Sequence, residues 1–193
     1  MSDLDLSFLR GTTIEAVDIE TTTHIVSKAF VREFGIAEFV DGVYVQGNSG
    51  LFSGGMSEPG ALAVHGITDA SVTGKPTFAS RASKVEKALS GKILMGHNIE
   101  KFDLPIIQRI LSSQGIKITG SGPGGKIQVI DTLLAARRYL RVSSNRLPDL
   151  CAMYGIAHGH HRAHGDAMSC WNLFLKIVET TGYRDLNRYI SLV

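Results

Sequence analysis

The N-terminal part of the chain alternates apolar and polar side chains with the two-residue period of β-strands. Residues 13–19 alternate in this way and then become apolar, which predicts a strand. Residues 30–40 and 43–52 are rich in Val, Phe and Ile, and the dipeptide Asp41-Gly42 between them favours a tight hairpin. Together the three segments predict consecutive antiparallel strands.

Further along the chain, stretches with helical spacing alternate with short apolar runs. Runs at 93–95 and 127–130 predict buried strands, the second of them the last strand of the sheet. Helical spacing predicts helices at 77–90, 99–111, about 131–141, 146–154 and 164–181. Glycine and proline predict loops at 54–60 and 112–126. This order of elements predicts an α/β fold, a mixed sheet with helices packed on it.

Length and composition fit one globular domain. The 193 residues are 44% hydrophobic and 20% charged, and no apolar run approaches the roughly 18 residues that span a bilayer. The first ten residues carry acids where a secretory leader carries bases, and Cys151 and Cys170 cannot form a disulfide framework. We therefore expect a cytoplasmic protein with free thiols and no membrane partner.

The net charge is close to zero. Lys and Arg number 20 against 18 Asp and Glu, which gives +2 at pH 7. This excludes a strongly basic nucleic-acid coat protein but not an enzyme that acts on nucleic acid. Residues 120–126 fit the start of a phosphate-binding loop, but Ile127 stands where that loop needs Ser or Thr, and strand-like residues follow. A surface loop is expected there instead.

Four carboxylates stand at the ends of separate predicted elements. Asp18 and Glu20 end the first strand two residues apart, so both project from the same face. Asp103 follows the strand at 93–95, and Asp166 lies near the start of the last helix. Each has an ordinary alternative, a solvated strand end or an acid that interacts with a helix dipole. If the four converge, divalent cations would offset their repulsion, and hard oxygen ligands suit magnesium or manganese.

Three segments in order resemble the motifs of the DEDDh 3′→5′ exonucleases. They are residues 17–22 (Val-Asp-Ile-Glu-Thr-Thr), 97–103 (His-Asn first, Phe-Asp last) and 161–166 (His-Arg-Ala-His-Gly-Asp). Residues 64–69, 129–133 and 145–154 are similar to the branch that contains the proofreading epsilon subunit of bacterial DNA polymerase III. The resemblance spans about residues 12–180 and implies a ribonuclease H-like fold with a five-stranded mixed sheet, in a single domain over 1–193.

The resemblance also implies hydrolysis with two metal ions, Mg²⁺ or Mn²⁺. Asp18, Glu20 and Asp166 would hold the first ion, Asp18 would bridge to the second, and Asp103 would lie nearby or act through water. Two ions about 3.5–4 Å apart activate water and stabilise the departing 3′ oxygen. His161 would be the general base that takes the proton of the water.

The spacing of His161 limits where it can act. Five residues separate it from Asp166, which is about 140° around a helix, so His161 must lie in a loop before the helix. The histidine-rich segment has two other interpretations, a zinc site or a solvated polar loop. The histidines concerned are His158, His160, His161 and His164.

Substrate contacts are implied by the resemblance alone. The backbone around Ile19, Thr21 and Thr22 would grip the terminal nucleotide, while His65 and Phe102 would flank its base and sugar. The alternative for Phe102 is a core position on a helix. Asn98 would contact substrate or cap a helix. Thr23 departs from the family, since many members carry Gly there.

These observations predict a metal-dependent 3′→5′ exonuclease that releases 5′-mononucleotides from single-stranded or frayed DNA ends. The alternatives are an exoribonuclease or oligoribonuclease-like RNA-trimming enzyme, a proofreading subunit bound to a DNA polymerase, an endonuclease and a non-catalytic binding module. Some members of the family are dimers, so a homodimer is a further expectation.

The predicted ligands also change how the net charge is interpreted. Of the 18 acids, 14 remain once these four are set aside, against 20 bases, and this surplus is available for phosphate. Part of it is concentrated in Lys126, Arg137, Arg138, Arg141 and Arg146.

Overall fold

A six-stranded mixed sheet forms the centre of the computed structural model, which describes residues 4–158 and 161–193. β1 (Thr13–Thr21), β2 (Val31–Val40) and β3 (Val43–Leu51) are antiparallel, as predicted. Asp41 and Gly42 both have positive φ, 52° and 82°, which is the left-handed geometry that a two-residue hairpin loop requires.

The other half of the sheet contains one strand more than predicted. β4 (Ile93–Gly96) and β5 (Gln128–Asp131) run parallel to β1, as expected, but β6 (Ile190–Leu192) pairs antiparallel with β5. The strand order is β3-β2-β1-β4-β5-β6. The five-stranded prediction was therefore wrong, and β5 is not the last strand. A three-residue strand is too short to show a period, and it forms because the edge of β5 is free to pair.

Within the ranges that the structure describes, six α-helices connect and cover the strands. They are α1 (Pro59–His65), α2 (Ala82–Leu89), α3 (Asp103–Ser112), α4 (Thr132–Tyr139), α5 (Leu147–Tyr154) and α6 (Ala163–Thr181). α1 begins inside the loop predicted at 54–60, because Pro59 at the first helical position favours a start rather than a break. α3 begins at Asp103, four residues later than predicted, because Asn98 has a φ of 67° and opens a turn instead.

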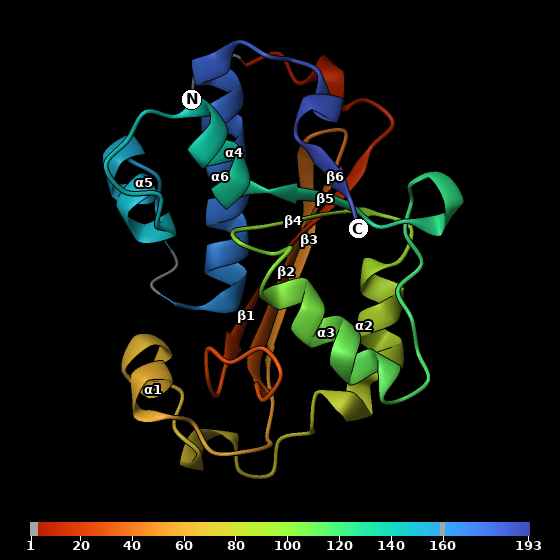
Figure 1. Cartoon of the computed structure of the whole chain (residues 1–193), viewed down its shortest axis with the longest axis vertical. Helices are drawn as coiled ribbons and strands as arrows, with labels where there is room; N and C mark the ends of the chain where they lie inside the picture. The colour runs from red at the N-terminus through yellow and green to blue at the C-terminus, as the bar shows by residue number, and fades with distance from the viewer. Residues whose placement is uncertain (1–3, 159–160) are drawn as a thin grey trace.

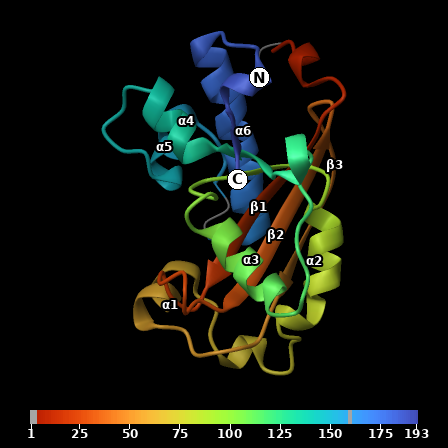
Figure 2. The same ribbon diagram turned by 45° about the vertical axis from the view of Figure 1, so that its right-hand side comes forward.

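Two apolar layers lie on opposite faces of the sheet. α6 runs along one face with α4 and α5 beside it, and α2 and α3 cover the other (Figures 1 and 2). In the first layer Trp171 of α6 stacks on Phe39 of β2 at 3.9 Å between ring centroids. Within the described residues, no helix has both the length and the apolar character to cross a membrane.

The first turn of α6 lies directly on the sheet. A Cβ atom at Gly35 of β2 would lie 2.1 Å from the backbone nitrogen of His164, far inside contact distance. A Cβ at Gly47 of β3 would lie 2.3 Å from the ring nitrogen Nε2 of the same histidine. Since Gly35 is paired in register with Asp18, this contact sets the distance between the start of α6 and the end of β1.

We expect Gly35→Ala to destabilise the protein by about 1–3 kcal/mol, because the new methyl group collides with backbone atoms that cannot rotate away. The measurement is the free energy of unfolding in urea. Gly50→Ala is the matched control, since its Cβ would meet only ordinary contacts with the ring of Phe52. Equal stability of the two variants would contradict the close contact.

Candidate active site

The fold brings the four predicted carboxylates to one groove of about 600 Å³. Asp18 and Glu20 come from the end of β1, Asp103 from the first residue of α3, and Asp166 from the first turn of α6. Glu20, Asp103 and Asp166 are 8%, 3% and 4% exposed, and Asp18 is partly buried. The acids therefore meet in a site with little access for water to screen them.

Asp103 is fixed by the backbone of β1. Its Oδ1 accepts a hydrogen bond of 3.1 Å from the backbone N–H of Ile19, the residue between Asp18 and Glu20. This bond joins the start of α3 to the end of β1, although 84 residues separate the partners. One buried hydrogen bond thus ties Asp103 to the strand that carries Asp18 and Glu20.

Burial and nearby carboxylates raise the pKa values of three of the four acids. Burial raises the pKa of Glu20 to about 8, with further contributions from nearby carboxylates, and raises the pKa of Asp103 to about 7. The pKa of Asp18 is raised well above its ordinary value, first by burial and then by the surrounding acids. A divalent cation among these oxygens would remove the penalty, so the donor set fits a hard cation such as Mg²⁺ or Mn²⁺.

His161 lies at this cluster and, as its spacing predicted, precedes the last helix. It precedes the N-cap of α6, and a ligand atom of His161, one of Glu20 and one of Asp166 all lie within 4.8 Å of one another. His158 also reaches the cluster, with its Nε2 3.2 Å from Oδ1 of Asp166. Sequence reasoning considered His158 only as part of a zinc site or of a solvated polar loop.

His164, from the same segment, does not gather with these two. His164 packs against Gly47 on β3 and is not part of the groove lining, whereas His158 and His161 are. His160 lies outside the described residues. The described histidines thus do not form the four-ligand set that the zinc interpretation required.

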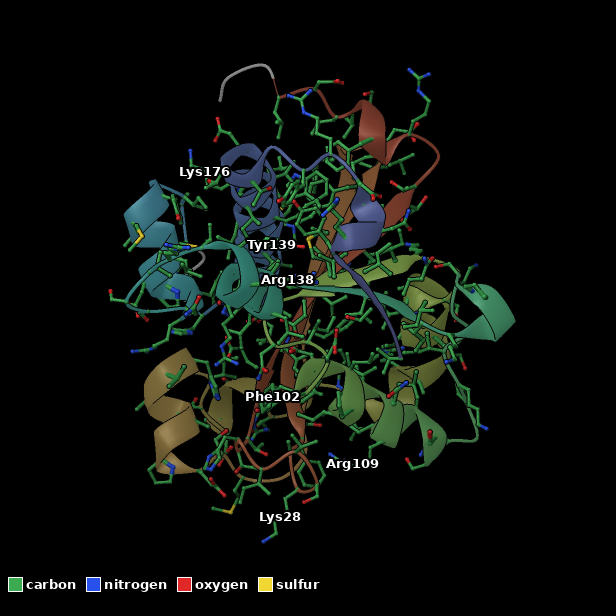
Figure 3. The ribbon with its side chains drawn as sticks, turned by 45° about the horizontal axis from the view of Figure 1, so that its top comes forward. Lys28, Phe102, Arg109, Arg138, Tyr139 and Lys176 are labelled. Carbon is green, nitrogen blue, oxygen red and sulfur yellow. The ribbon has the colours of Figure 1, made fainter. Side chains whose placement is uncertain are left out.

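The predicted substrate residues divide into two groups. Ile19, Asn98 and Phe102 line the groove. Thr21, Thr22 and His65 are not part of its lining, and we call these three the framework group. Phe102 is partly buried against the core and precedes α3, well apart from Arg138 and Tyr139 of α4 (Figure 3). Asn98 does not cap a helix, since α3 begins only at Asp103. Their place in the groove lining is consistent with substrate contact by Ile19, Asn98 and Phe102, which stays a prediction.

The framework group is bonded within the protein. Nδ1 of His65 accepts a hydrogen bond from the N–H of Ile67 (2.9 Å), so its Nε2 carries the proton and donates to the carbonyl of Thr21 (3.1 Å). Burial lowers the pKa of His65, in keeping with a neutral ring. Thr22 Oγ1 accepts from the N–H of Phe30, and Thr23 Oγ1 donates to Glu58. Contact of Thr21, Thr22 and His65 with a nucleotide stays a prediction.

A further part of the groove lining, here called the basic wall, is basic and polar. It is lined by Arg137 of α4 and, in the loop before α5, by Ser143, Ser144, Asn145 and Arg146. His97 secures this loop, since its ring nitrogens contact the Asn145 carbonyl at 2.9 Å and Thr132 Oγ1 at 3.0 Å. Arg138, next along α4, lies instead over the ring of Tyr139 and lines a separate cavity. The structure thus selects two of the clustered bases for the groove.

Sequence reasoning missed a further carboxylate and its partner. Glu33 of β2 is 1% exposed and pairs in register with Glu20. Arg162, the residue after His161, donates two hydrogen bonds of 3.1 Å to its carboxylate. The only local signal was a charged residue near the start of a largely apolar strand that also carries Arg32 and Glu38.

The architecture is of the ribonuclease H-like class. Exonuclease I of E. coli in complex with a dT13 oligonucleotide superposes with a TM-score of 0.78 at 18% identity, over 92% of this chain and 43% of that chain. Exonuclease X in complex with 5′ overhanging duplex DNA gives 0.66 at 23% identity, over 88% and 93%. At these identities the likeness establishes the fold.

The sequence comparisons identify the family. A family model described as Exonuclease (RNase_T) matches residues 16–174, so the chain belongs to that family, with the DEDDh type of motif. DNA polymerase III subunit epsilon of Buchnera aphidicola from Acyrthosiphon pisum is 31% identical over 159 residues, 80% of this chain and 65% of that protein. Protein NEN4 of Arabidopsis thaliana is 33% identical over 101 residues, 52% of this chain and 38% of that protein. The chain thus spans less than two thirds of the length of either relative.

The raised pKa values predict how stability depends on pH without metal. Glu20 and Asp103 keep their protons to about pH 8 and 7 when folded, against ordinary values of 4.5 and 3.8. The folded state therefore binds more protons than the unfolded chain between about pH 4.5 and 8, and stability falls as pH rises through that range. In EDTA we expect a loss on the order of 2–4 kcal/mol between pH 6 and 8.5 by urea unfolding.

Two comparisons assign this loss to the groove. Mg²⁺ should restore more stability at pH 8.5 than at pH 6, and Glu20→Gln should flatten the slope measured in EDTA. Burial also raises the pKa of Glu15 to about 7, but that residue pairs with Lys92 outside the groove lining, so its contribution should not respond to Mg²⁺. Stability that is flat or rises with pH in EDTA would contradict the electrostatic description of the cluster.

Proposed function

We propose that this protein is a metal-dependent 3′→5′ exonuclease that releases 5′-mononucleotides from single-stranded or frayed DNA ends. One observation carries the proposal: the four carboxylates and His161 line the same groove as Arg137 and Arg146. Acids that can hold cations share the groove with bases that can hold phosphate, which is the combination that cleavage of a polyanion requires. Both apolar layers pack on one sheet, which supports a single domain over residues 1–193.

The chemistry follows from the donor set. Asp18, Glu20, Asp103 and Asp166 would hold two divalent cations, which supply Lewis-acid stabilisation of the charge that develops on the phosphate and on the leaving 3′ oxygen. His161 takes a proton from the attacking water as the bond from its oxygen to phosphorus forms. The bond from phosphorus to the 3′ oxygen breaks, which leaves a 5′-mononucleotide and a strand with a new 3′ hydroxyl. General-base help of this kind is worth about 10²–10⁴ in rate.

The names of the similar proteins favour DNA over RNA as the substrate. The epsilon relatives are named as subunits of a DNA polymerase, and the structures of exonuclease I and exonuclease X hold DNA. The epsilon names also support a proofreading subunit as a second setting for the same activity. Association with a polymerase would appear as a partner in a pull-down, whereas the activity itself needs only the groove.

Loss of one ligand tests the activity. With Mg²⁺ and a 5′-labelled single strand, the wild type should shorten the strand one nucleotide at a time, and Asp18→Ala should lower the rate by at least about 10³-fold. EDTA should abolish cleavage, and a circular single strand should stay intact. Activity unchanged in Asp18→Ala would refute the site, and cleavage of the circle would indicate an endonuclease. An RNA strand of the same sequence, if cleaved faster, would reassign the substrate.

Removal of both groove arginines tests the basic wall. Arg137→Ala with Arg146→Ala should raise KM for an oligonucleotide about tenfold or more and reduce the salt slope of binding by about 1 per arginine. Hydrolysis of the p-nitrophenyl ester of thymidine 5′-monophosphate, which lacks upstream phosphates, should be unchanged. Arg138→Ala is the matched control, because this neighbour lines another cavity. Equal KM values for the double variant and the control would show that the wall does not hold the strand.

A further inference from the structure

Beside the groove, an ion pair joins β2 to the residue that follows His161. We propose that Glu33 and Arg162 form a positioning pair, which holds the ring of His161 at the acidic cluster. The inference rests on the proposed function, since it assigns a role to residues that support the proposed general base. Neither residue belongs to the acid set or lines the groove.

The contact has the geometry of a fixed support. Nε and Nη2 of Arg162 each lie 3.1 Å from a different oxygen of Glu33, so both carboxylate oxygens are engaged. The N–H of Ala163, the first residue of α6, approaches the same carboxylate at 3.4 Å. One buried side chain of β2 therefore holds both the guanidinium and the start of the helix. Two parallel charge-assisted bonds fix direction as well as distance.

The backbone of His161 needs such a support. Its φ is 59°, a left-handed conformation that is sterically unfavourable for an ordinary L-residue. A chain that is free to relax would leave this conformation and carry the imidazole with it. Arg162 adjoins His161 directly and is tied to the strand that carries Glu33, so the strained residue is held from its C-terminal side. Its N-terminal neighbours lie outside the described residues.

The register of the sheet directs the support to the reacting groups. Glu33 is paired across the strands with Glu20, which lies with His161 and Asp166 inside the 4.8 Å cluster. Two positions further along β2, Gly35 allows α6 to lie against the sheet beside Asp18. The pair and the glycine thus fix the same turn of chain at two successive points.

A purely structural role for the pair makes a different prediction. The side chain of Arg162 is 62% exposed, so its truncation removes little packing, and a pair with one exposed partner contributes modestly to global stability. If Arg162 served only to cap α6, its loss would act on every function of the groove alike. If it positions His161, its loss should be visible only while His161 is present.

A double-mutant cycle separates these cases. With saturating Mg²⁺ and a labelled single strand, Arg162→Ala should lower kcat about 10–100-fold, with KM within about twofold, because the substrate-binding wall is untouched. In a His161→Ala background, the same substitution should change kcat less than about twofold. Arg162→Lys, which keeps the charge but not the paired bonds, should recover part of the lost rate.

Further measurements control for general damage. Mn²⁺ affinity by calorimetry should stay within about threefold of wild type in Arg162→Ala, since the acids remain in place. Arg184→Ala breaks an exposed ion pair with Asp5 beyond the other end of α6, and should leave both kcat and stability unchanged.

Several results would overturn the inference. Normal kcat in Arg162→Ala would do so, as would losses from Arg162→Ala and His161→Ala that multiply, or a fall in Mn²⁺ affinity that matches the fall in rate. A wild-type kcat in His161→Ala would show that His161 is not the general base, and the pair would then have no base to position. Absence of any wild-type activity with Mg²⁺ or Mn²⁺ would instead show failure of the proposed function.

Discussion

The contact between the first turn of α6 and β2 governs the geometry of the groove. Gly35 admits the helix backbone where any side chain would collide, and it does so directly across from Asp18. Because α6 carries Asp166 and follows His161, this approach brings the C-terminal motif to the N-terminal one. The stack of Trp171 on Phe39 holds the middle of the same helix to the same strand. The apolar layer thus supplies the free energy that keeps the charged end in place.

The groove at the start of α6 brings like-charged carboxylates together, which is electrostatically unfavourable. Four acids share a groove in which burial raises the pKa values of Asp18, Glu20 and Asp103, and Glu33 adds a fifth carboxylate beside them. Arg162 offsets this fifth charge, and the remaining four are the ligands proposed for the cations. A site that is electrostatically unfavourable when empty binds a counter-charge strongly. The packing of the core offsets the electrostatic free energy that the empty cluster costs. The basic wall, with Arg137 and Arg146, gives the same groove positive charge that can hold the phosphates of a strand.

Much of this arrangement could be predicted from the sequence, because the sequence patterns concerned are local. Alternation predicted β1, β2 and β3, and Asp41-Gly42 predicted the hairpin between them. The spacing of Asp18 and Glu20 placed both acids on one face of a strand, and the spacing of His161 excluded the helix that follows it. Where short-range signals conflicted or were absent, prediction failed. Pro59 began a helix inside a predicted loop, and β6 was too short to show a period.

The amino-acid sequence by itself thus determined the order of most elements, the family and the acids that define the candidate site. Only the tertiary structure decided which other residues join them. Glu33 and Arg162 are 129 residues apart, and their contact depends on sheet register and on the approach of α6. Arg137 and Arg138 are neighbours in sequence, yet one lines the groove and the other lies over Tyr139. A helix turns by about 100° per residue, so the packing of α4 gave two adjacent arginines different surroundings.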